Sequence, residues 1–343
     1  MRYNARAPLR IGLAGGGTDV SPYTDEFGGL VINATIDLFA NVSLIMSSSP
    51  GVTIFTENPV PYFIEDIHKI NPADCPPPFD LYAGALKWFA NTYGYTNLNG
   101  ITIYSSIDVP LGSGLGTSST LMVALIGVLL ELRNEKRTSS EIAAIAYDIE
   151  RIELGHAGGR QDQYAASFGG LNAMHFTSAT SCSIDSIVCD KAFLKTLESR
   201  LILYYTAHDR FSSVIIKEQM ERASRKEADS LSAMHQLKIQ AHEMKSALFN
   251  KDFNAISRLL DSGFQEKKRM ATGISTPVIE EIYHAARHAG ALAGKISGAG
   301  GGGFMVFYSE EVHKSAVTDA LCTFGGKIFP FSFTEKGLES WKE

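Results

Sequence analysis

Residues 110–119, with the sequence PLGSGLGTSS, constrain the fold of this chain more than any other segment. Three glycines alternate with other residues, hydroxyl side chains follow, and an apolar run over 121–132 predicts a helix directly after the loop. Glycine lets backbone N–H groups turn inward, and the N-terminus of the next helix carries partial positive charge. The segment therefore predicts an anion-binding strand–loop–helix unit, with a nucleotide phosphate as the usual anion. A purely structural turn is the alternative, but it rarely needs so many glycines and hydroxyls together.

The loop differs from two common phosphate-binding motifs. It lacks the lysine of G-x-x-x-x-G-K-[ST], and the chain contains neither the H-R-D nor the D-F-G signature of protein kinases. Charge on a bound phosphate must therefore be neutralised by Mg²⁺, by the helix terminus or by a distant residue.

Length and charge restrict the class of protein. The chain has 343 residues, which predicts two domains sharing a cleft, and its net charge of −6 argues against nonspecific nucleic-acid binding. The apolar run over 121–132 is too short to cross a bilayer, and the N-terminus shows no signal pattern. The four cysteines lack zinc-site spacing, so we interpret them as reduced thiols of a cytoplasmic protein that binds neither nucleic acid nor membrane.

Apolar patterning predicts an α+β chain whose halves divide near residue 178. In the first half we expect strands at 9–14, 30–36, 39–46 and 101–107, and a helix from about 80 to 93. A capping box at 138–141 opens a helix whose apolar face carries Ile142, Ile145, Ala146, Ile149 and Ile152. In the second half we expect strands at 201–206, 304–308 and 327–333, and helices at 212–227, 230–249, 252–261, 277–289 and 311–324.

Three segments resemble the motifs of the GHMP superfamily of sugar and metabolite kinases, in the expected order. Residues 110–119 resemble the second motif, P-x-x-x-G-L-G-S-S, while 7–19 resemble the first and 295–304 the third. Within the superfamily the D-glycero-D-manno-heptose 7-phosphate kinases are most similar, followed by the L-fucokinases. The resemblance implies a two-domain α+β fold with the active site between the domains. The resemblance implies that the N-terminal domain, over 1–178, is similar to domain 2 of ribosomal protein S5. It implies that the C-terminal domain, over 179–343, is ferredoxin-like.

The resemblance assigns phosphate and metal ligands. Ser118 matches the second serine of the motif and is expected to bind Mg²⁺, with a helix N-cap as the alternative. Glu150 matches the glutamate of E-x-x-x-x-G that binds Mg²⁺ in the superfamily, and Glu153 is its rival one turn further on. The expected ATP-phosphate loop comprises Gly112, Ser113, Gly114, Leu115, Gly116, Thr117, Ser118 and Ser119.

The resemblance also assigns residues to the acceptor. Asp162 matches the aspartate of G-x-x-D-Q in sugar kinases, which faces the phosphate-accepting hydroxyl as a base or an orienting group. Arg10 matches the arginine of the first motif and is expected beside Asp162, although a surface cation is the alternative. Arg160 is a second candidate to balance the charge of Asp162.

Substrate recognition is expected from the first and third motifs. Gly16 and Gly17 replace the Glu and His of galactokinases, which predicts a roomier pocket for another sugar, with Thr18 and Asp19 retained to bind hydroxyls. An Asx turn is the alternative for Asp19. In the third motif, residues 298–303 also satisfy the dinucleotide pattern G-x-G-x-x-G, but a strand-like segment follows instead of a helix. We therefore expect Gly300 and Gly301 to let backbone approach the substrate.

A phosphate already on the sugar would need cations away from the ATP. The candidates are Lys267, Lys268, Arg269, Lys295 and Arg210, of which we assign Lys268 to the substrate. A solvated helix face is the alternative for 267–269.

The sequence thus predicts an ATP- and Mg²⁺-dependent kinase, monomeric or homodimeric, acting on a small sugar phosphate. The resemblance implies phosphorylation of the anomeric hydroxyl of D-glycero-D-manno-heptose 7-phosphate to the 1,7-bisphosphate, in nucleotide-activated heptose synthesis. A fucose-type 1-kinase is the alternative enzyme, and a mevalonate-type kinase is disfavoured by the D-Q and T-D sequences. A non-catalytic sensor would be favoured by loss of Ser118, Glu150 or Asp162, all of which are present.

Overall fold

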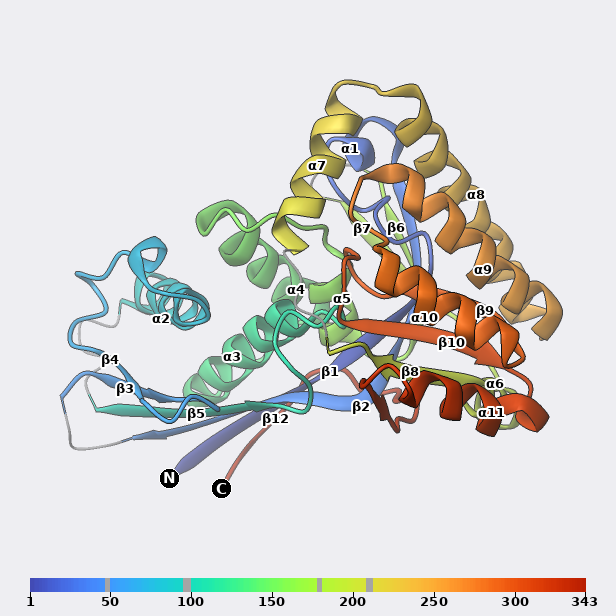
Figure 1. Cartoon of the computed structure of the whole chain (residues 1–343). Coiled ribbons are helices and arrows are strands. Elements are labelled where there is room, and N and C mark those ends of the chain that lie inside the picture. The colour runs from blue at the N-terminus through green and yellow to red at the C-terminus, as the bar shows by residue number, and fades with distance from the viewer. Residues whose placement is uncertain (47–49, 95–99, 178–180, 208–211) are drawn as a thin grey trace.

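Figure 1 shows a computed structural model, which describes residues 1–46, 50–94, 100–177, 181–207 and 212–343. Each half of the chain contributes one sheet with helices packed on it. The predicted two-domain α+β organisation is confirmed.

The first sheet is built around two long neighbouring strands, β1 (Arg2–Ala14) and β2 (Gly29–Met46). The two strands predicted at 30–36 and 39–46 are this single β2, which pairs with a different neighbour along each half. The strand order is β12-β1-β2-β5-β3-β4, where β12 is Glu339–Lys342; in addition, β6 pairs with β2, and β7 pairs with β6. The remaining bounds are β3 (Val52–Phe55), β4 (Tyr62–Ile64), β5 (Ile101–Ile107), β6 (Leu171–Phe176) and β7 (Cys182–Ser186).

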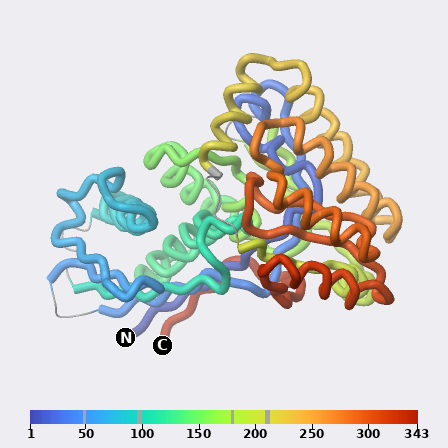
Figure 2. Tube along the Cα trace, in the orientation of Figure 1, coloured from blue at the N-terminus to red at the C-terminus, as the bar shows by residue number. Residues whose placement is uncertain are grey.

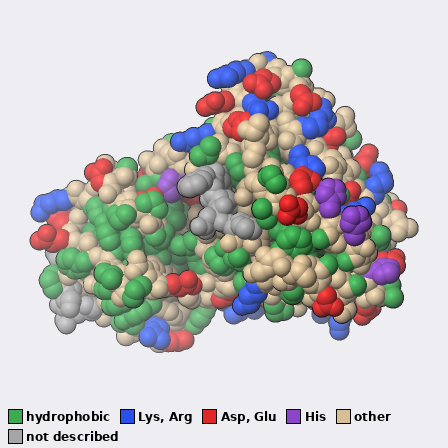
Figure 3. Space-filling model, in the orientation of Figure 1, with side chains coloured by type: hydrophobic (Ala, Val, Ile, Leu, Met, Phe, Trp, Pro, Cys, Tyr) green, Lys and Arg blue, Asp and Glu red, His purple; other side chains and the backbone are tan. Residues whose placement is uncertain are grey.

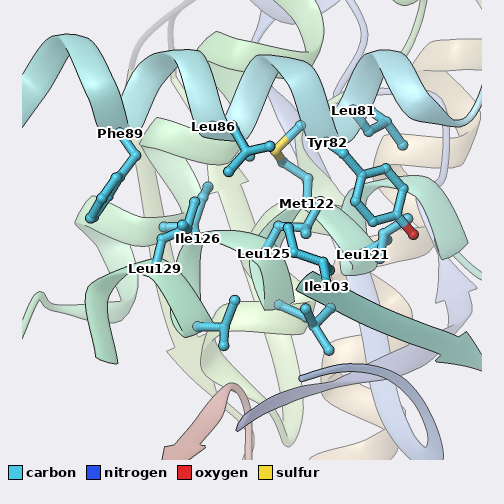
Figure 4. Close-up of a cluster of buried hydrophobic side chains, with 14 of the residues drawn as sticks. Leu81, Tyr82, Leu86, Phe89, Ile103, Leu121, Met122, Leu125, Ile126 and Leu129 are labelled. Carbon is cyan, nitrogen blue, oxygen red and sulfur yellow. The ribbon is translucent and has the colours of Figure 1, made fainter. Parts of the chain in front are cut away.

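Helices α2 (Phe79–Tyr93) and α3 (Thr117–Arg133) bury the apolar side of this sheet. Because α3 is apolar on all sides, it lies between the sheet and α2 rather than at the surface. Figure 4 shows Leu86 and Phe89 of α2 above Leu125 and Ile126 of α3. This packing fixes the N-terminus of α3, where the glycine loop ends.

The predicted capping box is confirmed, but the helix that follows it changes form. Thr138 caps α4 (Ser139–Tyr147), which continues as the π-helix η2 (Asp148–Glu153). The added backbone residue per turn rotates the apolar face, so the predicted burial of Ile152 is wrong: this side chain is 68% exposed. Helix α5 (Gln161–Phe168) follows.

The second sheet is antiparallel, with the order β11-β8-β10-β9. Its strands are β8 (Leu201–Tyr205), β9 (Ala291–Ile296), β10 (Phe304–Ser309) and β11 (Lys327–Phe329). The helices of this half are α6 (Lys191–Arg200), α7 (Ser212–Ser224), α8 (Ala228–Phe249), α9 (Phe253–Met270), α10 (Pro277–His288) and α11 (Glu311–Cys322). Helix α9 runs beyond the predicted end at 261. The short helices are α1 (Tyr23–Phe27) and the 3₁₀ helix η1 (Pro72–Asp74).

The two halves share a hydrophobic core. Leu9 and Ile11 of β1 belong to one buried cluster with Met244 of α8 and Val306 of β10. The surfaces of the halves differ: Figure 3 shows hydrophobic side chains gathered over the lobe of α2, β3 and β4, and charged ones over the helical lobe of α7 and α8. The shared core therefore holds the two halves of the chain together.

The end of the chain returns to the first sheet. The predicted strand at 327–333 ends at Phe329, and β12 (Glu339–Lys342) pairs antiparallel with β1. The termini therefore lie side by side (Figure 2), and the N–H of Arg2 donates to the carbonyl of Glu343 at 3.1 Å. The division at residue 178 stays a prediction, although the first sheet also takes in β7 and β12.

Candidate active site

The three glycine-containing segments meet in space. The carbonyl of Gly114 accepts hydrogen bonds from Nη1 of Arg10 at 2.7 Å and from the hydroxyl of Ser297 at 3.0 Å. Gly303 lies directly against the backbone of Ser113. Only glycine fits there, because an added Cβ would lie 2.2 Å from the carbonyl oxygen of Ser113. Residues of β1 and of the 297–303 segment between β9 and β10 thus contact the loop at Ser113 and Gly114.

The loop is braced from within. Gly116, at a φ of 81°, precedes the first turn of α3, and the N–H of Gly112 donates to the hydroxyl of Thr117 at 2.9 Å. Leu115 is fully buried in the core, while Ser118 is half-buried on the wall of a cavity of about 400 Å³. We call this hollow the loop cavity. Its other loop residues are Gly112, Gly114, Gly116, Thr117 and Ser119.

Glu150 lies behind the loop in a polar cluster. It is 1% exposed, and its Oε2 accepts hydrogen bonds from the hydroxyl of Ser119 at 2.6 Å and from Nε2 of Gln163 at 2.7 Å. Its Oε1 pairs with Nη1 of Arg151 at 3.1 Å. Because η2 turns Glu150 toward the loop and leaves Glu153 exposed, the geometry favours Glu150 over its rival.

The donors around the loop cavity fit a magnesium ion. Ser118 and Glu150 both line it, and within the described part of the chain no group of three or more His, Cys, Asp or Glu side chains forms a metal cage. Mg²⁺ commonly takes one or two protein oxygens and completes its shell with phosphates and water. The hydroxyl and carboxylate on this wall match that donor set.

Asp162, which is half-buried, forms an ion pair with the buried Arg10. Its Oδ1 accepts from Nε of Arg10 at 2.7 Å and lies 2.6 Å from Nη2. The Arg10 side chain is 5% exposed, so the alternative of a surface cation is wrong. Gly116 packs directly on the Asp162 carboxyl, which brings the predicted acceptor residue against the loop.

A second hollow, of about 100 Å³, adjoins the loop cavity at Asp162. We call it the acceptor cavity. Segments from both halves of the chain line it, including Gly16, Asp19, Gln161, Lys267 and Lys295. The two cavities share the residues Arg10, Arg151, Ala157, Asp162, Ile216, Gly298 and Ala299.

Asp19 shapes the acceptor cavity. Its Oδ2 accepts from the backbone N–H groups of Arg160 and Gln161, each at 3.0 Å, which fixes the turn before α5. A Cβ at Gly159 would lie 1.9 Å from the same oxygen, so only glycine fits beside it. Thr18 is fully buried and donates to the carbonyl of Gly15 at 2.8 Å, which places it behind the cavity wall.

The predicted glycines divide into lining and packing positions. Gly16 and Gly17 both line the acceptor cavity; a Cβ at Gly16 would meet only Nε2 of Gln161 at 4.0 Å, whereas a Cβ at Gly17 would lie 2.6 Å from Cε of Met270. Gly300 and Gly301 pack against the backbone at Ile274 and are not part of the wall, which Gly298 and Ala299 provide instead.

The predicted cations are similarly divided. Lys268 pairs with Glu280 at 3.0 Å and does not line the acceptor cavity; its neighbour Lys267 does, as does Lys295. Arg160 is buried, and its Cζ lies 5.0 Å from the centre of the Phe176 ring. Arg210 lies outside the described residues.

Two participants were missed by sequence reasoning. Gln163 and Arg151 hold Glu150 in place, and each adjoins a residue that the motifs did identify. That adjacency was the signal available in the sequence.

Comparison with known proteins defines the class. Residues 80–170 match the N-terminal domain of the GHMP kinases and 244–327 match their C-terminal domain. The chain is 36% identical to D-glycero-alpha-D-manno-heptose 7-phosphate kinase of Campylobacter jejuni, covering 98% of both. The chain belongs to the GHMP kinases, and so it is a phosphotransferase with an alcohol group as acceptor.

Two further relatives bear on the substrate. A crystal structure of a D-glycero-D-manno-heptose 1-phosphate kinase from Bacteroides thetaiotaomicron superposes with a TM-score of 0.81 at 32% identity, covering 99% of both chains. A bifunctional fucokinase/GDP-fucose pyrophosphorylase of Arabidopsis thaliana is 24% identical over 92% of this chain and 30% of its own length.

No helix in the described ranges combines the length and apolar character needed to cross a bilayer.

Proposed function

We propose that this protein is an ATP- and Mg²⁺-dependent sugar kinase that phosphorylates the anomeric hydroxyl of D-glycero-D-manno-heptose 7-phosphate, giving the 1,7-bisphosphate. The observation that carries the proposal is the position of the Arg10–Asp162 pair, on the wall shared by the loop cavity and the acceptor cavity. A sugar hydroxyl in the acceptor cavity would meet, at this carboxylate, a phosphate held in the loop cavity. The use of ATP throughout the GHMP kinases supports ATP as donor.

The residues divide the reaction between the two cavities. In the loop cavity, backbone N–H groups and the N-terminus of α3 hold the phosphates of ATP. Ser118 and Glu150 hold Mg²⁺, which when bound neutralises phosphate charge. In the acceptor cavity, Asp162 orients the sugar hydroxyl and accepts its proton as the new oxygen–phosphorus bond forms and the bond to ADP breaks. Arg10 fixes the position of this carboxylate through its contacts with Oδ1.

The sugar is proposed from the relatives. Those from Campylobacter and Bacteroides both act, by name, on a phosphorylated D-glycero-D-manno-heptose, but one name gives a 7-phosphate and the other a 1-phosphate. The 7-phosphate leaves the anomeric hydroxyl free to accept, which suits a kinase that prepares a sugar for activation by a nucleotide. We therefore place the enzyme in nucleotide-activated heptose synthesis.

A fucose-type 1-kinase is the second candidate. The similarity to the bifunctional plant fucokinase extends over 92% of this chain. The substrate of such a kinase differs from heptose 7-phosphate in one testable respect, because fucose carries no phosphate.

A substrate panel separates the two candidates. With radiolabelled ATP, we expect kcat/KM for D-glycero-D-manno-heptose 7-phosphate to exceed that for unphosphorylated heptose, fucose and galactose by roughly 100-fold or more, as charge-assisted contacts to a phosphate allow. Equal or better efficiency with fucose would overturn the heptose-phosphate proposal and leave a sugar 1-kinase.

A further inference from the structure

Two buried lysines lie on the wall of the acceptor cavity. Lys267, in the last turn of α9, is 7% exposed, and Lys295, near the end of β9, is 9% exposed. Nζ of Lys295 donates to the carbonyls of Gly12 at 2.7 Å and Leu13 at 3.4 Å, while Nζ of Lys267 donates to the carbonyl of Gly298. A buried ammonium needs compensation by negative charge as well as by hydrogen bonds.

The carboxylates around the cavity are engaged elsewhere. Asp162 pairs with Arg10, and Asp19 accepts backbone N–H groups of the turn before α5. Across the described ranges, no carboxylate forms an ion pair with Lys295. Arg151 pairs with Glu150, so the other charged side chains on this wall are three cations, Arg10, Lys267 and Lys295, and two carboxylates, Asp19 and Asp162, which leaves an excess of positive charge.

This arrangement lowers the pKa of Lys295. Burial, together with the nearby charges of Lys267 and Arg10, lowers the pKa of Lys295 to about 7. An anion bound beside the ammonium would relieve both the burial and the repulsion, and so it would favour the charged form.

We propose that Lys295 and Lys267 form a phosphate-binding pair that holds the phosphate already present on the sugar while its free hydroxyl lies at Asp162. This inference rests on the proposed function and names the residues that select a phosphorylated sugar. Both lysines line the acceptor cavity and neither lines the loop cavity, so the anion is the group that remains on the sugar, not the one transferred from ATP. A phosphate monoester brings about two negative charges into a wall with an excess of positive ones.

The first test compares neighbouring lysines. Lys295→Met and Lys267→Met should each raise KM for heptose 7-phosphate by roughly 10–100-fold, the loss expected for one hydrogen bond between charged groups. KM for ATP, which is held in the other cavity, is the reference, and kcat/KM for unphosphorylated heptose should fall by a much smaller factor than kcat/KM for heptose 7-phosphate. Lys268→Met is the matched control, because Lys268 pairs with Glu280 away from the cavity and its loss should leave both sugars unaffected. An equal fall with both sugars in Lys295→Met would show a structural role and overturn the inference.

The second test uses pH and a conservative variant. Because binding needs the ammonium form, KM for heptose 7-phosphate should rise above about pH 7 in the native enzyme, while KM for unphosphorylated heptose stays flat. Lys295→Arg, whose guanidinium stays charged, should retain phosphate selectivity and lose this rise. The same rise in Lys295→Arg would assign the titration to another group and count against the inference.

A sugar-independent probe separates this inference from the proposed function. Calorimetry with inorganic phosphate, in the presence of a saturating non-hydrolysable ATP analogue, should detect binding that Lys295→Met abolishes. If phosphate binds in this way while heptose 7-phosphate is not a substrate, the site stands and the proposed sugar is wrong. If heptose 7-phosphate is preferred equally by the native enzyme and both methionine variants, the function stands and the lysine pair is wrong.

Discussion

The loop cavity and the acceptor cavity share a wall but are built differently. The loop cavity draws most of its lining from two stretches, residues 112–119 and 150–162. The acceptor cavity combines β1, the turn before α5, α7, the end of α9 and the third glycine segment, which are far apart in the sequence. Both cavities carry charged side chains, but the loop cavity adds the hydroxyls of Thr117, Ser118 and Ser119, whereas the acceptor cavity adds Asp19, Lys267 and Lys295.

This difference separates catalysis from selectivity. Backbone N–H groups at a helix N-terminus bind any phosphate chain, so the loop cavity suits a donor common to a whole family. Side chains such as Asp19 and Lys295 can be exchanged one at a time without altering the loop. We therefore expect changes in the loop cavity to affect every acceptor alike and changes in the acceptor cavity to alter the choice of sugar.

The largest effect is expected on the shared wall. Asp162→Asn keeps the shape of the side chain but removes the charge that orients the acceptor and takes its proton. We expect kcat to fall by roughly 10²–10⁴-fold for every sugar, with ATP affinity little changed. Steady-state kinetics and nucleotide titration provide the measurement. Near-normal turnover would assign the role to another residue.

A smaller effect is expected from the metal ligands. Glu150→Gln and Ser118→Ala should each raise the Mg²⁺ concentration needed for half-maximal activity, by roughly 10–100-fold, a range typical of weakened metal sites. Glu153→Gln is the control, because Glu153 is exposed. A Mg²⁺ dependence that follows Glu153 instead would reverse the choice between the two glutamates.

The smallest effects are expected from two glycines of the acceptor cavity. Gly159→Ala places a methyl group against Asp19 and should cost about 1–3 kcal/mol of stability through overpacking, with a raised KM for the sugar. Gly16→Ala has room and should change stability by less than about 0.5 kcal/mol. Thermal unfolding of both variants checks this difference. Equal stability of the two would mean that Asp19 does not fix the turn.

Local sequence predicted much of the loop cavity. The glycine loop, Ser118, Glu150 and Asp162 lie in short motifs whose neighbours in sequence are also neighbours in space. The capping box at Thr138 was confirmed for the same reason, since its two residues satisfy each other's backbone. The π-helix was not predictable, because its apolar residues are compatible with ordinary helical spacing until the backbone bonding shifts.

The acceptor cavity depended on long-range packing. Lys267 lines the acceptor cavity and Lys268 does not, because α9 continues to Met270 and only one of its faces meets β9. Neither feature can be read from the local sequence. Strand β12 was missed because its partner, β1, lies at the opposite end of the chain. The close approach of Asp19 to the turn before α5 likewise joins segments separated by about 140 residues.

The position of the transferred phosphate tests the central proposal most directly. Phosphorus NMR of the product formed from heptose 7-phosphate and ATP should show a second phosphate coupled to the anomeric proton, as in a 1,7-bisphosphate. A new phosphate on any other carbon, or turnover of heptose 1-phosphate in preference to the 7-phosphate, would contradict the proposed orientation of the sugar between Asp162 and the lysine pair.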